Sequence, residues 1–100
     1  MLLPPLQIFV INNLKYDTDK MELISDECEY WYKGELLGTP MRYRGRDVRL
    51  WRSSKGNWLL TYKSDYTTYG KALCEKEVEN ILIQYDLEMY EQIFGEVEEA

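Results

Sequence analysis

The chain has 100 residues, of which 45% are hydrophobic and 14% aromatic, and this composition predicts one folded domain rather than a disordered segment. A formal net charge of −6 disfavours nucleic-acid binding by the whole surface. The sequence has no histidine, which excludes Ser-His-Asp and Cys-His catalysis within one chain, and it carries no glycine-rich phosphate-binding motif. We therefore expect a protein that is not an enzyme and that uses no metal or cofactor.

The first residues, "MLLPPLQIFVI", are apolar, but they lack the basic start of a signal peptide and are shorter than the roughly 20 residues of a membrane span. We expect residues 1–6 to be disordered or extended, and the protein to be cytoplasmic. Residues 7–11 predict a strand, "NN" a turn, and residues 14–16 a short return strand. "DTD" at 17–19 indicates a turn in which an Asp accepts backbone N–H bonds, rather than a cation site.

Alternating apolar residues over 21–33 predict one long strand, or two strands with a break near Asp26. Three turn-forming residues then mark a loop: Gly34, Gly38 and Pro40. We expect Cys28 and Cys74 to be small buried hydrophobes, and a disulfide between them is the alternative.

The stretch "RLWRSSKGNWLL" (49–60) predicts the centre of an antiparallel hairpin over residues 48–62, with Gly56 at a left-handed turn position. In this register Leu50 lies opposite Leu60, and Arg52 lies across the Trp58 ring. The face predicted to join the core comprises Val48, Leu50, Trp58, Leu60 and Tyr62. The face predicted to be basic comprises Arg49, Trp51, Leu59, Thr61 and Lys63.

Helical spacing follows a predicted polar loop, "SDYTTYGK" (64–71). The first helix carries an apolar stripe of Val78, Ile81, Leu82 and Tyr85. Asp86 is the expected N-cap of a second helix, which ends at Gly95 before a frayed acidic tail at 96–100. The apolar residues of that helix are Leu87, Tyr90, Ile93 and Phe94. The prediction is a single α+β domain over residues 1–100, with an antiparallel sheet of about four to five strands and two short C-terminal helices.

Charge is segregated along the chain. Residues 75–100 hold nine acids and one lysine, and residues 17–35 hold seven acids and two lysines. Residues 41–63 hold seven bases and a single acid, Asp47. Either the acids are merely solvated and neutralise the basic strand, or one charged surface meets a partner.

Three segments, "KYDTDKMELI" (15–24), "LWRSSKGNWLL" (50–60) and "MYEQIFGEV" (89–97), resemble a family of small bacterial and phage-borne proteins. Its members share a YDTDTA-like start, an LYRTKKGNYFL-like hairpin and a YEKIFGE-like tail in the same order. The resemblance implies an accessory protein of phages or mobile elements and brings no catalytic residue with it. The chain departs from the pattern at Cys74, where relatives have a Ser-type helix cap, and in its basic run "MRYRGRDVRLWR".

The leading hypothesis is a non-enzymatic phage or mobile-element protein that binds and inhibits a host protein. A nucleic-acid-handling defence protein is the favoured target, in the manner of an anti-CRISPR inhibitor. The candidate partner-binding acids are Glu75, Glu79, Glu88 and Glu91. The alternatives are a virion structural or assembly protein, or a nucleic-acid-binding regulatory protein that uses the basic aromatic strand 42–55. The candidate residues on that strand are Arg42, Arg44, Arg46, Arg49, Trp51 and Lys55.

Overall fold

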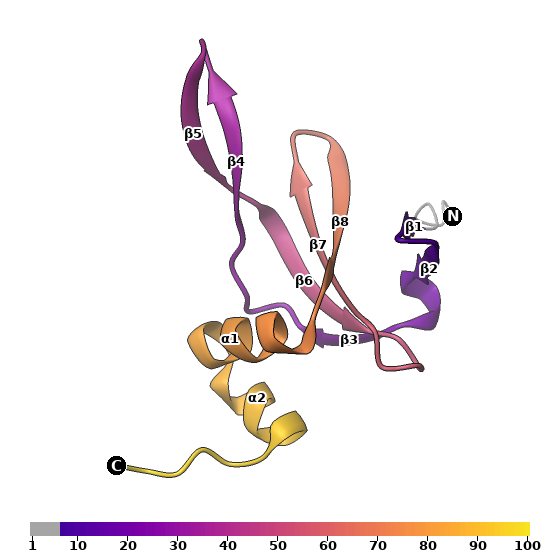
Figure 1. Ribbon diagram of the computed structural model, residues 1–100, viewed down its shortest axis with the longest axis vertical. Helices are drawn as coiled ribbons and strands as arrows, with labels where there is room; N and C mark the ends of the chain where they lie inside the picture. Colours follow the sequence, from indigo (N-terminus) through magenta and orange to yellow (C-terminus); the bar gives the residue numbers. More distant parts are fainter. Residues whose placement is uncertain (1–6) are drawn as a thin grey trace, which may run out of the picture.

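A four-stranded antiparallel sheet forms the centre of the protein in a computed structural model that describes residues 7–100 (Figure 1). Its strands lie in the order β3 (Glu22–Ser25), β6 (Arg46–Arg52), β7 (Trp58–Ser64) and β8 (Thr67–Leu73). Two separate hairpins flank it, and these are β1 (Ile8–Ile11) with β2 (Leu14–Asp17), and β4 (Trp31–Leu36) with β5 (Thr39–Arg44). A 3-10 turn, η1 (Thr18–Lys20), follows β2, and the helices α1 (Glu75–Tyr85) and α2 (Leu87–Phe94) follow β8. The α+β class is confirmed, with more strands than predicted; the prediction for residues 1–6 lies outside the described residues.

The β6–β7 hairpin has the predicted register. Leu50 pairs with Leu60 and Arg52 with Trp58, and Gly56 has a φ of +84° in the turn. The Arg52 guanidinium carbon lies 5.4 Å from the centre of the Trp58 ring, as expected for a cation–π contact. Because the turn residues and the period-two pattern both favour this hairpin, its local sequence is sufficient to set the pairing.

One face of the sheet packs against the two helices, and their contact forms the main core. Leu50, Leu60, Val78 and Leu82 have no exposed surface, and each contributes about 1.5–3 kcal/mol when fully buried. The rings of Trp58 and Phe94 lie 6.3 Å apart and join α2 to this core. The apolar stripe predicted for the first helix is thereby confirmed.

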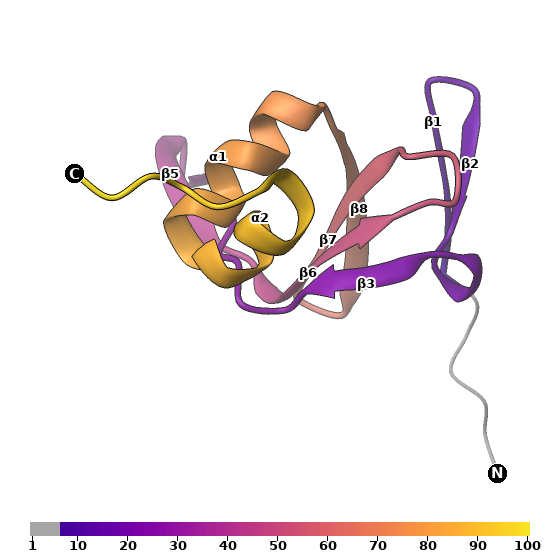
Figure 2. The ribbon, with the colours of Figure 1, turned by 90° about the horizontal axis from the view of Figure 1, so that it is seen from below.

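The opposite face is covered by the β1–β2 hairpin, so that the sheet lies between this hairpin and the helices (Figure 2). Phe9 packs directly over Gly70, and the Gln7 side chain donates a hydrogen bond to the Thr68 hydroxyl at 3.4 Å. Leu59 is completely buried and Thr61 is 3% exposed. The prediction of a basic face here is therefore wrong in part, because the N-terminal hairpin covers its centre and only its charged ends stay exposed.

Two predicted loops are in fact strands. Gly34 and Pro40 lie inside β4 and β5, and only Leu37 and Gly38 form the turn between them. The polar segment 64–71 forms a two-residue turn and then most of β8, which is an edge strand. Polar and glycine residues are tolerated there because an edge strand is only half covered. Over residues 21–33 the second alternative holds, since β3 and β4 are separate and a non-strand segment, 26–30, joins them.

The β4–β5 hairpin, which we call the arm, forms no backbone ladder with any other described strand and projects from the body (Figure 1). Its attachment to the body includes the following contacts. The Gly45 N–H donates to the Tyr30 carbonyl at 2.7 Å, and the hydroxyls of Tyr32 and Ser64 lie 2.5 Å apart. The Tyr32 ring also stacks on Tyr62 with the ring centres 5.3 Å apart. Aromatic packing therefore replaces strand pairing at this junction.

The helix caps follow the sequence signals closely. Asp86 accepts a hydrogen bond from the Met89 N–H at 3.2 Å and caps α2, and Gly95 ends that helix with a φ of +103°. Cys74 is the N-cap of α1, where the Glu77 carboxylate accepts its N–H at 3.1 Å. This hydrogen bond is the largest cause that lowers the pKa of Glu77 below its ordinary value. A carboxylate three residues on thus compensates for the weak cap. Neither helix in the described part of the chain is long and apolar enough to cross a membrane.

Candidate functional site

The four predicted acids lie on the two C-terminal helices, and we call them the acidic helical surface: Glu75, Glu79, Glu88 and Glu91. Glu75 and Glu88 are exposed, whereas Glu79 and Glu91 are half-buried beside the apolar stripe. The Glu91 carboxylate accepts the Val97 N–H at 3.0 Å, which folds the start of the tail back against α2. All four acids therefore lie on the pair of C-terminal helices, although Glu91 also holds the start of the tail.

The ion pairs of the described residues do not involve this surface. All four of them join a base on β5, β6 or β7 to an acid that lies outside the helices. The pairs are Arg44–Glu29 at 2.5 Å, Arg49–Asp47 at 3.0 Å, Lys63–Asp47 at 3.2 Å and Arg52–Glu22 at 3.3 Å. These ion pairs leave out the acids of the helices, whereas they engage four of the seven bases counted over residues 41–63.

Asp47 is the acid at the centre of the basic strand. Partial desolvation acts to raise its pKa, but the hydrogen bonds from Lys63 and Arg49, together with their positive charges, outweigh this and hold the pKa below its ordinary value. The carboxylate is therefore ionised at neutral pH and pairs with two of the seven bases counted over residues 41–63, of which it offsets one unit of charge.

The predicted basic residues do not form one surface. Arg42 and Arg44 lie on the arm, Arg46 and Arg49 lie on β6 in the body, and Lys55 lies in the β6–β7 turn. The Arg46 guanidinium donates a hydrogen bond to the Asp65 carbonyl. Among these arginines, Arg42 and Arg46 have no carboxylate partner in the described chain.

Trp51 does not offer a free stacking ring. Its indole N–H donates to the Thr61 hydroxyl at 2.9 Å, and its side chain is half-buried on the sheet. The combination of phosphate-binding arginines and a base-stacking tryptophan, expected for strand 42–55, is therefore not brought together by the fold.

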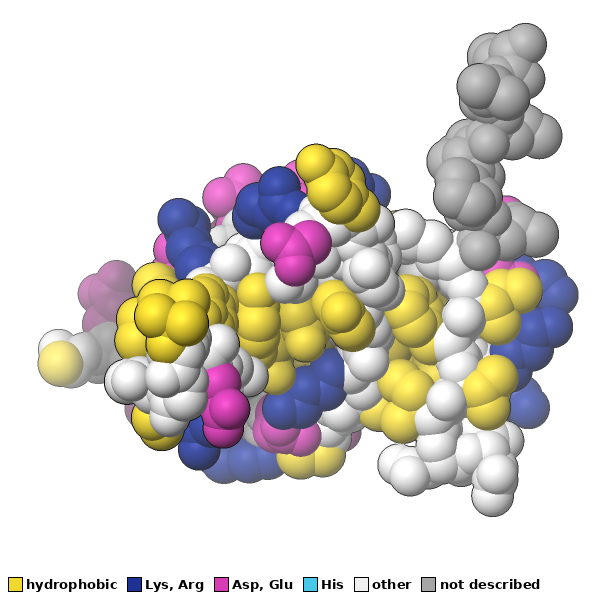
Figure 3. Space-filling model, turned by 90° about the horizontal axis from the view of Figure 1, so that it is seen from above, with side chains coloured by type: hydrophobic (Ala, Val, Ile, Leu, Met, Phe, Trp, Pro, Cys, Tyr) yellow, Lys and Arg dark blue, Asp and Glu magenta, His cyan; other side chains and the backbone are white. Residues whose placement is uncertain are grey.

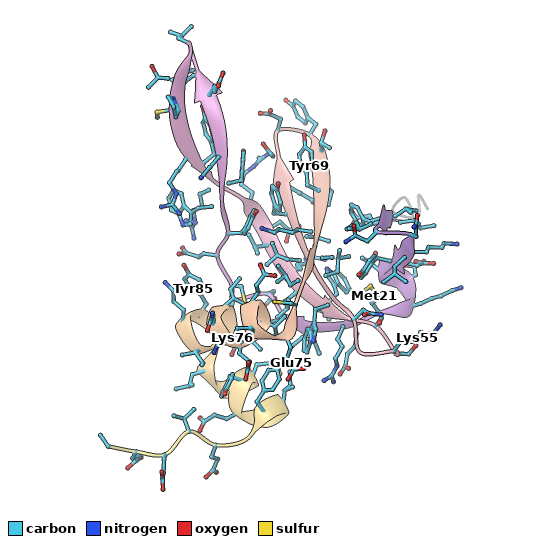
Figure 4. All side chains as sticks on the ribbon, in the orientation of Figure 1. Met21, Lys55, Tyr69, Glu75, Lys76 and Tyr85 are labelled. Atoms are coloured by element: carbon cyan, nitrogen blue, oxygen red, sulfur yellow. The ribbon has the colours of Figure 1, made fainter. Side chains whose placement is uncertain are left out.

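Sequence reasoning missed a row of stacked tyrosines that runs from the arm to the edge strand. Successive ring centres lie 5.6 Å apart from Tyr43 to Tyr32, 5.3 Å from Tyr32 to Tyr62, and 5.5 Å from Tyr62 to Tyr69. Tyr69 lies near the tip of the β7–β8 hairpin (Figure 4). Burial is the largest cause that raises the pKa of Tyr62, so its ring is a neutral packing element. The tyrosines come from four strands, β5, β4, β7 and β8, so no local sequence pattern could have revealed the row.

The two cysteines are both free thiols. Cys28 is buried as predicted, and burial is the main cause that raises its pKa. Cys74 is exposed, so the prediction that it is buried is wrong, because the chain leaves the sheet at this position to begin α1. Residues 7–100 contain no group of three or more acidic or cysteine side chains arranged to hold a metal ion.

The comparisons with known proteins give no family assignment. No protein-family model, curated protein or solved structure matches this chain at a significant level of similarity. The function of the chain must therefore be inferred from its charges and contacts.

Proposed function

We propose that this protein is a non-enzymatic inhibitor whose acidic helical surface occupies a basic, nucleic-acid-binding cleft of another protein. The observation that carries the proposal is the distribution of ion pairs. Arg49, Arg52 and Lys63 of the central sheet are paired with nearby acids, while residues 75–100 hold nine acids beside one lysine and none of these acids takes part in an ion pair with a described residue. An uncompensated acidic surface is complementary to a cleft that normally holds a phosphate backbone.

The same distribution argues against the alternative in which strand 42–55 binds nucleic acid. Arg44 and Arg49 are already paired with carboxylates, and the Trp51 N–H is already bonded. A phosphate contact would have to replace these pairs rather than use free cations. The resemblance to phage-borne accessory proteins supports a target in the host cell, with a defence protein as the favoured class.

The test compares four forms of the immobilised protein in the same bacterial lysate. The first is the parent, and the second has Glu75, Glu79, Glu88 and Glu91 changed to Lys. The third is a matched control with the same change of net charge, made at exposed acids that lie outside the helices: Asp19, Asp26, Glu27 and Glu35. The fourth form has Gln at the four helical positions, and it separates loss of charge from loss of the fold. Circular dichroism shows whether each form is folded.

We expect a nucleic-acid-binding protein to be retained by the parent and the control, less by the Gln form, and not by the Lys form. Adding DNA or RNA to the lysate should release the target, because both ligands compete for one cleft. The proposal fails if the helical reversal changes retention no more than the control does. It also fails if the purified parent binds labelled DNA or RNA tightly with strong salt dependence, which would restore the nucleic-acid alternative.

A further inference from the structure

We infer that a pocket between the β1–β2 hairpin and the β6–β7 turn is a binding site for a small organic phosphate. The pocket has a volume of about 460 Å³, within the range of roughly 300–1,000 Å³ that is typical of small-molecule sites. Its walls come from segments that are about forty residues apart in sequence, residues 14–20 and 53–57. This site lies outside the acidic helical surface and does not depend on the function proposed for it.

Three lysines, Lys15, Lys20 and Lys55, line this pocket. Within residues 7–100 none of them takes part in an ion pair, unlike most of the bases on the central sheet. All three are exposed, and dark blue side chains gather at the β1–β2 end of the molecule in Figure 3. Three lysines that line one pocket without an ion-pair partner among the described residues give it a positive potential, which a bound anion would offset.

One carboxylate, that of Asp17, also lines the pocket, but it is already engaged. Its Oδ1 accepts the N–H of Asp19 at 3.1 Å and so holds the turn η1 in place. With three lysines and one carboxylate in its lining, the pocket keeps a net positive charge.

The acidic helices lie at the other end of the protein and cannot neutralise these lysines. Figure 2 shows α1 and α2 on the far side of the sheet from the β1–β2 hairpin. Lys55 is likewise well separated from Glu75 in Figure 4. Exposed charges are screened over about 8 Å at physiological ionic strength, which is short beside the 38 Å that the molecule spans along the horizontal axis of Figure 1, the direction that separates the helices from the hairpin. The positive field of the pocket is therefore local and persists in an acidic protein.

The rest of the lining favours a phosphate attached to a small organic body. Ser54 contributes an exposed hydroxyl that can donate to an anionic oxygen, and Leu14 contributes an apolar wall. The turn is held rigid, because the Ser53 N–H bonds to the Asn57 carbonyl at 2.8 Å and the Asn57 N–H bonds to the Ser53 hydroxyl at 3.0 Å. Lysines are common phosphate ligands because they act as compact point charges.

The test is calorimetric titration of the full-length protein with pyrophosphate, AMP and uncharged adenosine at two salt concentrations. We expect pyrophosphate and AMP to bind, adenosine to bind at least about tenfold more weakly, and salt to weaken the anions because the lysines are exposed. Changing Lys15, Lys20 and Lys55 together to Gln should reduce AMP affinity at least about tenfold. The matched control changes three exposed lysines that do not line this pocket, Lys33, Lys71 and Lys76, to Gln and should alter affinity less than about twofold.

Three results would overturn the inference. One is the absence of heat and of a thermal shift with both pyrophosphate and AMP at millimolar concentration, for a protein that circular dichroism shows to be folded. Another is an equal loss of affinity in the Lys33, Lys71 and Lys76 control, which would mean attraction to the general charge of the protein. Tighter, lysine-dependent binding of a ten-nucleotide single strand than of AMP would assign the pocket to a nucleic-acid backbone instead, and would also refute a small-molecule site.

Discussion

Changing Gly70 to alanine tests how the β1–β2 hairpin is seated on the sheet. A Cβ atom at this position would lie 2.7 Å, 2.8 Å and 3.1 Å from three ring atoms of Phe9. Carbon atoms normally approach to about 3.5–4.0 Å, so the ring must retreat by roughly 1 Å. Overpacking of this kind costs about 1–3 kcal/mol, whereas replacing a strand glycine by alanine recovers about 0.5–1 kcal/mol. We expect a net loss of about 1–2 kcal/mol in the free energy of unfolding.

The assay is urea unfolding followed by tryptophan fluorescence, in which this loss lowers the midpoint by about 0.5–1 M for an m-value of about 2 kcal/mol/M. The informative comparison is the same substitution in a Phe9→Ala background, where the obstructing ring is absent. There Gly70→Ala should be neutral or stabilising, by up to about 1 kcal/mol. An equal loss in the two backgrounds would show that Phe9 does not pack over Gly70, and the seating of the hairpin would need another explanation.

Three further predictions concern the core, one carboxylate and the thiols. Leu82→Ala should cost about 2–5 kcal/mol because Leu82 is fully buried, while Ile83→Ala, 49% exposed on the same helix, should cost less than about 1 kcal/mol; similar losses in denaturant unfolding would contradict the assigned face of α1. Asp47→Asn should lower the free energy of unfolding at neutral pH by about 0–1 kcal/mol. Because the pKa of Asp47 is lowered in the folded protein, this difference should decline as the pH falls below the ordinary pKa of 3.8 and should vanish once the carboxyl of the folded protein is protonated. Unfolding curves over the acid range measure this difference, and a gap that persists when the carboxyl is protonated would point to lost packing instead. Cys74 should react at once with an aromatic disulfide reagent, and Cys28 only after denaturation, because burial shields its thiol and raises its pKa; two equally fast thiols in the native protein would argue against a buried Cys28.

The parts of the fold that the sequence predicted are those with local signals. The β6–β7 hairpin has a glycine at its turn and alternating residues on both sides, and α1 has an apolar stripe with period 3.6. Residues 34–40 were taken for a loop because of turn-forming residues such as Gly34, and residues 64–71, which include Gly70, because of their polar composition. Both glycines instead make room for an aromatic ring from another strand, Tyr43 and Phe9 respectively. That reason depends on tertiary contacts, which no window of sequence contains.

The same distinction between local sequence signals and tertiary contacts applies to the candidate sites. Counting charges along the chain was sufficient to locate the acidic helices, because all nine acids lie within one continuous segment. It was misleading for the basic strand, where partners such as Glu29 and Glu22 come from other segments and neutralise Arg44 and Arg52. The lysine pocket was missed for the opposite reason, since its members are far apart in sequence and become neighbours only when the β1–β2 hairpin packs beside the β6–β7 turn.

The attachment of the arm has a consequence for the dynamics of the protein. Since β4 and β5 pair with none of the other described strands, the arm can detach without breaking a single hydrogen bond of the four-stranded sheet. Its release costs mainly the tyrosine stacking and the two hydrogen bonds at its base. We therefore expect residues 31–44 to behave as a separate foldon, whose backbone amides exchange with deuterium through subglobal opening long before those of β6 and β7. If the helices bind the target as proposed, the arm would stay free to change its position relative to the sheet.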